Sequence, residues 1–170
     1  MWVFGYGSLM WDGWENSRGC LRRVLATLPG FRRAFNKESV RNWGTREQPG
    51  PTLNLEADPA SNCKGMAFKF PDEKQHELLA YLRNREACEP VLREIKLESG
   101  PQVIAFVSIY AGKNLIRDKT LAELAEMARK ASGSSGRCFD YVRGIIEKLS
   151  DLGLDDPAVT EFWQAIQQQL

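Results

Sequence analysis

The sequence predicts an α+β fold in which a small mixed β-sheet curls into a barrel-like shape and helices flank it. Three observations support this prediction. The first two-thirds of the 170 residues contain short apolar runs separated by turns, the last third contains helical patterns, and no repeat or linker composition interrupts the chain. We therefore expect a single domain over residues 1–170.

The strands are predicted from apolar runs bounded by glycine, proline and polar residues. Residues 22–28 and 31–37 flank Pro29-Gly30, which is typical of two strands joined by a turn. Arg32-Arg33, beside this turn, can belong to a basic patch or to a solvated strand edge. The other runs are residues 2–6, the alternating stretch around Leu53 and Leu55, and residues 64–70, 91–98 and 102–110.

Capping signals predict where the helices begin. Asp72 with Gln75, and Thr120 with Glu123, have the spacing of a capping box. The second of these helices should run to about residue 131. A flexible loop at 132–136, a long helix to Leu152 stopped by Gly153, and a last helix from Asp156-Pro157 complete the pattern.

The charge balance narrows the class of partner. The chain has 23 basic and 22 acidic residues, which gives no overall attraction to nucleic acid or to an anionic membrane. No apolar run is long enough to cross a bilayer, and the N-terminus lacks the features of a signal peptide. We expect a cytoplasmic protein, a monomer or weak dimer, with a small-molecule partner and neither nucleic acid nor membrane as a partner.

Few side chains suit metal or nucleophile chemistry. The four cysteines, Cys20, Cys63, Cys88 and Cys138, form no CxxC pair, so we expect neither a zinc site nor disulfides. The single histidine, His76, excludes most Ser-His-Asp and histidine-rich metal sites unless it takes part itself. We expect no metal and no cofactor.

Glu86 is the acidic residue that fits a structural role least well. In a helix, Leu78, Leu79 and Leu82 share a face with Glu86. Burial and the nearby helix C-terminus would both raise the pKa of this carboxylate toward the range that suits proton transfer. The alternative, that Glu86 only pairs with a basic neighbour at the surface, has equal support from the spacing.

A glycine-rich segment, Phe4-Gly5-Tyr6-Gly7-Ser8-Leu9, is the second candidate feature. A strand that ends in two glycines can turn sharply and expose backbone N–H groups to a carboxylate or an oxyanion. Met10 stands where a dinucleotide-binding loop would need its third glycine. The alternative is a glycine bulge at the end of a strand, which the segment alone favours.

These segments, taken together, resemble the ChaC-like γ-glutamylcyclotransferase family. The resemblance lies in residues 4–11, FGYGSLMW, in Tyr81-Leu-Arg-Asn-Arg-Glu-Ala87 and in Gly133-Ser-Ser-Gly-Arg-Cys-Phe-Asp-Tyr141, which keep the family order. It also includes residues 30–35, 44–50 and 152–156, so it extends over nearly the whole chain.

The resemblance implies both a fold and a reaction. The family fold is a small barrel-like sheet with flanking helices. The family reaction is an internal aminolysis, in which the α-amine of a γ-glutamyl group attacks its own side-chain carbonyl to form 5-oxoproline. By resemblance, Glu86 is catalytic and Tyr6, Gly7, Ser8 and Leu9 hold the γ-glutamyl end. Tyr141 lines the pocket, and glutathione is the leading substrate.

Three functions stay open at this point. They are a cyclotransferase for glutathione, a cyclotransferase for another γ-glutamyl amine or peptide, and a non-catalytic γ-glutamyl-binding module. The chain reads Cys88-Glu89-Pro90 where many family members have Gly-Gly-Tyr, and Phe106 stands where a tyrosine is expected. Both departures bear on the substrate more than on the reaction, and the presence of Glu86 argues against the binding module.

Overall fold

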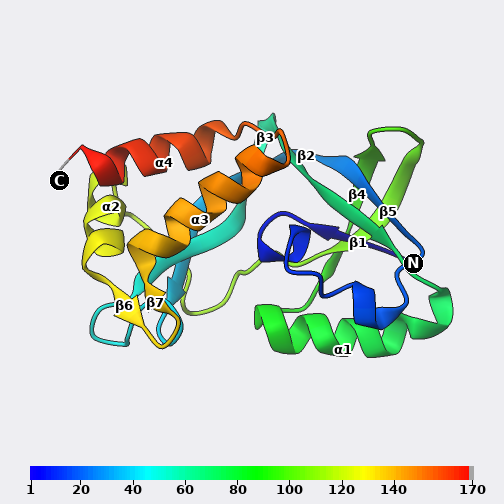
Figure 1. Cartoon of the computed structure of the whole chain (residues 1–170), viewed down its shortest axis with the longest axis horizontal. Coiled ribbons are helices and arrows are strands. Elements are labelled where there is room, and N and C mark those ends of the chain that lie inside the picture. The colour runs from blue at the N-terminus through cyan, green and yellow to red at the C-terminus, as the bar shows by residue number, and fades with distance from the viewer. Residues whose placement is uncertain (169–170) are drawn as a thin grey trace. The chain divides into compact units, whose positions relative to one another are not determined.

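The computed structural model describes residues 1–168 and divides the chain into two compact units. The first unit contains Met1–Arg32 and Leu55–Tyr110, and the second contains Arg33–Asn54 and Ala111–Leu170. Figure 1 labels the helices and strands. A single domain over residues 1–170 stays a prediction. None of the helices within residues 1–168 is long and apolar enough to cross a membrane.

A closed barrel forms the centre of the first unit. Its strands follow the order β1-β3-β2-β4-β5, and β1 is antiparallel to β3 but parallel to β5. The predicted α+β class and mixed barrel-like sheet are therefore confirmed. The strands are β1 (Trp2–Gly5), β2 (Arg22–Ser39), β3 (Gly50–Lys69), β4 (Val91–Leu97) and β5 (Gln102–Val107).

Two predicted strand boundaries are wrong, because β2 and β3 are each one long strand. Pro29-Gly30 does not reverse the chain. Gly30 has a φ of +76° and open space where a Cβ would stand, so it absorbs a local irregularity within β2. The stretches around Leu55 and at 64–70 join through polar residues in β3. Strand pairing, which the apolar pattern does not reveal, sets the length of both strands.

Apolar side chains fill the barrel and the space under helix α1 (Gln75–Glu86). Each fully buried Phe or Leu contributes roughly 1.5–3 kcal/mol relative to an exposed one. From α1, Leu78 and Leu82 are buried, whereas Leu79 is partly exposed. The helix thus lies with its Leu78–Leu82 stripe toward the core. The buried barrel residues include Val3, Phe4, Leu28, Phe68, Ile95, Leu97 and Val107.

The predicted capping box at Asp72 and Gln75 is wrong, although the helix itself is confirmed. Asp72 lies in a 3-10 turn, Asp72–Lys74, and α1 begins at Gln75. The Asp72 carboxylate binds the N-terminal ammonium group, which also donates to the Phe70 carbonyl at 2.8 Å. Hydrogen bonding to this ammonium and its positive charge lower the pKa of Asp72. A charged donor competes well against a backbone N–H for the same carboxylate.

The second unit contains the C-terminal part of β2, the N-terminal part of β3 and several helices. Thr120 and Glu123 form the predicted capping box, and Asp156 caps the last helix by accepting from the Val159 N–H at 3.2 Å. Residues 132–136, predicted as a flexible loop, form a small hairpin in which Ser134 N–H donates to the Arg41 carbonyl at 2.8 Å. The elements are α2 (Leu121–Lys130), β6 (Ser132–Gly133), β7 (Gly136–Arg137), α3 (Cys138–Asp151) and α4 (Pro157–Gln167).

Arg33 is buried within the second unit and does not lie on a solvated strand edge or in a basic patch. Its side chain is 1% exposed, and its Nη1 lies 2.7 Å from Oδ2 of Asp156. Asp156 thus serves both as a helix cap and as the counter-ion of a buried guanidinium. This is a tertiary contact between residues 123 positions apart.

Candidate active site

The N-terminal turn, residues Tyr6–Leu9, follows directly from β1 in the first unit. Backbone hydrogen bonds close it. Met10 N–H donates to the Gly7 carbonyl at 2.8 Å, and the Trp11 and Asp12 N–H groups donate to the Ser8 carbonyl at 3.2 and 3.1 Å. Gly7, Ser8 and Leu9 contribute further backbone N–H groups to the turn. Gly7 is partly exposed and Ser8 is exposed, so this part of the turn can receive a ligand.

Glu86 is the last residue of α1. The helix ends because Ala87 adopts a left-handed conformation with a φ of +55°, and the Ala87 N–H donates to the Arg83 carbonyl at 3.0 Å. The Glu86 side chain is 23% exposed, so it lies on the edge of the buried leucine stripe rather than inside it. Such a carboxylate is accessible to a ligand yet largely shielded from water.

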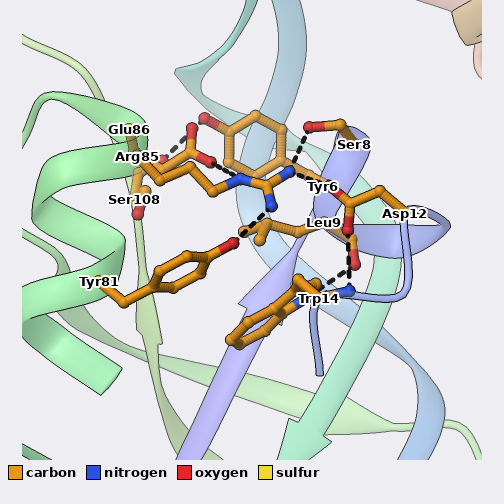
Figure 2. Close-up of polar contacts among 9 residues, drawn as sticks. All are labelled: Tyr6, Ser8, Leu9, Asp12, Trp14, Tyr81, Arg85, Glu86 and Ser108. Atoms are coloured by element: carbon orange, nitrogen blue, oxygen red, sulfur yellow. Dashed lines mark hydrogen bonds and ion pairs between the residues drawn. The ribbon is translucent and has the colours of Figure 1, made fainter. Parts of the chain in front are cut away.

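Arg85 links Glu86 to the N-terminal turn (Figure 2). Its Nε donates to Oε1 of Glu86 at 3.2 Å, and its Nη2 donates to Oγ of Ser8 at 2.8 Å. Nη2 also forms an ion pair with Asp12, and Nη1 donates to the Tyr81 hydroxyl at 2.9 Å. The Glu86 carboxylate and the turn therefore contact the same guanidinium, and Arg85 and Ser8 are 77 positions apart in sequence.

The charge of Arg85 is secured by these contacts. Burial by itself would lower the pKa of the guanidinium, but hydrogen bonds to Asp12 and Tyr81, with the charge of Asp12, raise it overall. Arg85 therefore carries a full positive charge at any pH relevant to the protein.

Aromatic side chains also contact the N-terminal turn and helix α1. The Tyr6 hydroxyl donates to the Ser108 carbonyl at 2.8 Å in a buried position just beyond the ends of β1 and β5. The Trp14 indole N–H donates to the Leu9 carbonyl at 3.0 Å, and the indole stacks on Tyr81 with ring centroids 5.6 Å apart. The turn and α1 are thus joined through rings as well as through Arg85.

The first unit contains Tyr6, Gly7, Ser8, Leu9 and Glu86 of the predicted site, and Arg85 contacts both the turn and Glu86.

Tyr141, the remaining predicted site residue, belongs to the second unit. Its hydroxyl accepts from the Leu53 N–H at 3.1 Å, and its ring centroid lies 5.0 Å from that of Trp43. The functional roles of all of these residues stay predictions.

Sequence reasoning assigned no part in this site to Asp12, Trp14, Tyr81 or Arg85. Tyr81 and Arg85 are four residues apart in a helix, so their contact was available from helical spacing. The contacts of Asp12 with Arg85 and of Trp14 with Tyr81 join segments that are far apart in sequence, and the sequence carries no local signal for them.

The arrangement supplies a partly shielded carboxylate, a fixed cation and a turn with backbone amides. A carboxylate in this setting can accept a proton and return it, and the amides can bind a negatively charged oxygen. Among residues 1–168 no group of three or more His, Cys, Asp or Glu side chains is arranged to hold a metal ion.

Comparison with known proteins finds similarity over the whole length. A family model described as ChaC-like protein matches residues 1–169. The chain is 30% identical to gamma-glutamylcyclotransferase 2-3 of Arabidopsis thaliana, over 95% of this chain and 85% of the relative. It is 29% identical to the glutathione-specific gamma-glutamylcyclotransferase of Escherichia coli K12, over 100% of this chain and 74% of the relative.

Solved structures show the same fold. A crystal structure of a gamma-glutamyl cyclotransferase specific to glutathione from yeast aligns with a TM-score of 0.83. The alignment covers 99% of this chain and 98% of the yeast chain, at 21% sequence identity. At that identity the likeness is one of fold.

Proposed function

The chain belongs to the ChaC-like family, and from this premise we propose that it is a γ-glutamylcyclotransferase that converts glutathione to 5-oxoproline and cysteinylglycine. A relative named gamma-glutamylcyclotransferase matches at 30% identity over 95% of the chain, and one named glutathione-specific gamma-glutamylcyclotransferase matches at 29% over 100%. The observation that carries the proposal is the placement of a partly shielded carboxylate, Glu86, beside the N-terminal turn through a shared guanidinium.

The proposed reaction is an internal aminolysis. The α-amino nitrogen of the γ-glutamyl group attacks the γ-carbonyl carbon, and a C–N bond forms to close a five-membered ring. The tetrahedral intermediate then collapses, the original amide C–N bond breaks, and the leaving nitrogen takes a proton. The nucleophile belongs to the substrate, so the protein must supply proton transfer, orientation and stabilisation of the oxyanion.

Glu86 carries the proton transfer in this proposal. As a carboxylate it removes a proton from the substrate ammonium, and as a carboxylic acid it returns a proton to the leaving amine. A positioned acid–base group contributes typically ~10²–10⁴-fold to a rate. The turn at Tyr6–Leu9 holds the γ-glutamyl end through its backbone amides. In this way the amine and the carbonyl of one flexible chain are brought together, which supplies the proximity contribution.

Product analysis of the wild type and of Glu86→Gln tests the proposal. Glutamine keeps the shape of the side chain but cannot transfer a proton as a carboxyl group does, so we expect 5-oxoproline formation to fall by roughly 10²–10⁴-fold. Glu56→Gln serves as the matched control, because Glu56 is a half-exposed carboxylate of the same unit that pairs with Arg32 at 2.5 Å. Equal turnover by wild type and Glu86→Gln would refute the mechanism.

A substrate panel separates the proposed functions. Glutathione and a set of other γ-glutamyl amines and peptides are incubated with the protein, and 5-oxoproline is measured. Preference for glutathione supports the proposal, preference for another compound identifies a different γ-glutamyl substrate, and binding without product indicates a binding module. Phe106 and the segment Cys88-Glu89-Pro90 are the departures that motivate the wider panel. The proposal places the reaction in the cytosol, which cell fractionation tests.

A further inference from the structure

We propose that Arg85 is a positioning residue for the reaction, in that its guanidinium fixes the Glu86 carboxylate relative to the N-terminal turn. The inference rests on the proposed function and deepens it. It starts from Figure 2, in which Arg85 lies between Glu86 and the turn and points toward both.

The first step of the argument is geometric. A guanidinium has a planar set of N–H donors, and Arg85 directs all three of its nitrogens to acceptors, two on its own helix α1 and the others beyond β1. Nε contacts Glu86, Nη1 contacts Tyr81, and Nη2 contacts Ser8 and Asp12. A planar group held at three nitrogens cannot rotate without breaking contacts. The Glu86 carboxylate therefore has a fixed cation on one side.

The second step concerns charge. Arg85 contacts two carboxylates, Asp12 and Glu86, while its own side chain is 21% exposed. Contacts of this kind are less screened by salt than contacts at a fully exposed surface. Asp12 pairs with Nη2 of the guanidinium, and Nε donates to Glu86, so the two carboxylates contact different nitrogens of the same cation.

The third step concerns the aromatic side chains that hold Arg85 in place. Tyr81, which accepts from Nη1, stacks on Trp14 and lies 3.6 Å from the Arg18 guanidinium. Trp14 in turn donates to the Leu9 carbonyl of the turn. The contacts thus run from the turn through Trp14 and Tyr81 to Arg85 and on to Glu86, which is the arrangement expected of a preorganised site.

The turn does not depend on Arg85 for its own shape. Its backbone hydrogen bonds, from Met10 to Gly7 and from Trp11 and Asp12 to Ser8, lie within the segment, and Trp14 anchors Leu9. Loss of Arg85 should therefore displace the Glu86 carboxylate. The backbone amides of the turn, which hold the γ-glutamyl end in our proposal, should stay in place. The kinetic consequence is a fall in kcat with little change in KM.

The test compares wild type, Arg85→Ala and Arg85→Lys with glutathione as substrate, by 5-oxoproline formation. A displacement of about 1 Å at a reacting group can cost about 100-fold in rate, and we expect this loss in kcat for Arg85→Ala. KM should change less than about threefold, and millimolar guanidinium chloride should restore at least about tenfold of the lost rate by occupying the vacated position. Lysine keeps the charge but not the planar donors, so Arg85→Lys should lose about tenfold.

Arg32→Ala is the matched control, because Arg32 is 48% exposed and pairs with Glu56 across the strands. Its kcat should equal that of the wild type. If Arg85→Ala does not fold, as judged by circular dichroism, Arg85→Lys decides the question, and full kcat in that variant would overturn the inference. A rise in KM at unchanged kcat would also overturn it, since Arg85 would then bind substrate directly. Failure of the wild type to form 5-oxoproline would instead contradict the proposed function.

Discussion

Gly65→Ala offers a test of how closely the barrel supports the N-terminal turn. A Cβ on Gly65, in β3, would stand 2.4 Å from the Gly5 carbonyl oxygen and 2.6 Å from the Phe4 ring. Ordinary van der Waals contact begins at 3.4 Å, so the Gly5 carbonyl would have to move by about 3.4 − 2.4 = 1.0 Å. Gly5 is the last residue of β1, directly before the turn. The added methyl group should therefore disturb both the barrel and the site.

The expected cost follows from the clash. Forcing a methyl group into a packed position costs about 1–3 kcal/mol of unfolding free energy, and a clash with backbone on one side lies toward the upper end. A shift of this size at the start of the turn should also lower kcat by about 100-fold.

Gly144→Ala is the matched control. Gly144 lies inside α3 with nothing within 4 Å of its Cβ position, so the same change should stabilise the protein by about 0.5–1 kcal/mol.

Urea unfolding followed by circular dichroism gives the free energies, and 5-oxoproline formation gives kcat. The prediction requires the two alanine variants to shift stability in opposite directions. The reasoning is refuted if the free energy of unfolding of Gly65→Ala lies within about 0.5 kcal/mol of the wild-type value and its kcat is unchanged. The close approach of β3 to β1 would then not constrain the turn.

The remaining predictions concern the second unit. Asp156→Ala should lower the free energy of unfolding by about 3–5 kcal/mol, because it removes the counter-ion of buried Arg33 and the cap of α4; Asp156→Asn should cost about 1 kcal/mol less, because asparagine can keep the cap. Equal costs in urea unfolding would contradict the dual role. Burial raises the pKa of the Cys138 thiol to about 12, so above about pH 9 the folded protein keeps a proton that the unfolded chain loses. The stability that this thiol contributes therefore falls as pH rises from about 9 to 12. Cys138→Ala should lack this dependence, with a difference in slope of up to about 1.4 kcal/mol per pH unit, and parallel slopes would contradict the assignment.

The local features of this protein could be predicted because they depend on neighbouring residues. The capping box at Thr120 and Glu123 and the Asp156 cap each involve a side chain and a backbone group three residues away. Gly5 and Gly7 in series left a sharp turn and a glycine bulge open at the end of the first strand, and the structure has a turn there. Residue spacing alone left Glu86 open between an acid–base group and a surface carboxylate, and only the resemblance to a known family favoured the first.

Other features were decided by contacts between distant segments. Pro29-Gly30 has the composition of a turn, yet it lies inside one long strand, β2, whose neighbours in the barrel are β3 and β4. Residues 132–136 have the composition of a flexible loop, but the Arg41 and Asn42 carbonyls accept from their amides and hold a hairpin. The composition of a segment indicates which conformations it favours by itself. The strands and carbonyl groups that decide its structure here lie far away in the sequence.

By itself the sequence determined the α+β class and the starts of α2 and α4, since each depends on spacing within a few residues or on composition, and it singled out Glu86 as a candidate through a family resemblance. Only the tertiary structure decided that Arg85 joins Glu86 to Ser8 and Asp12, and that Arg33 is buried against Asp156. The physical reason is that an arginine side chain carries the same charge and donors everywhere. The acceptors it meets depend on which strands close the barrel and which helix end lies beside them.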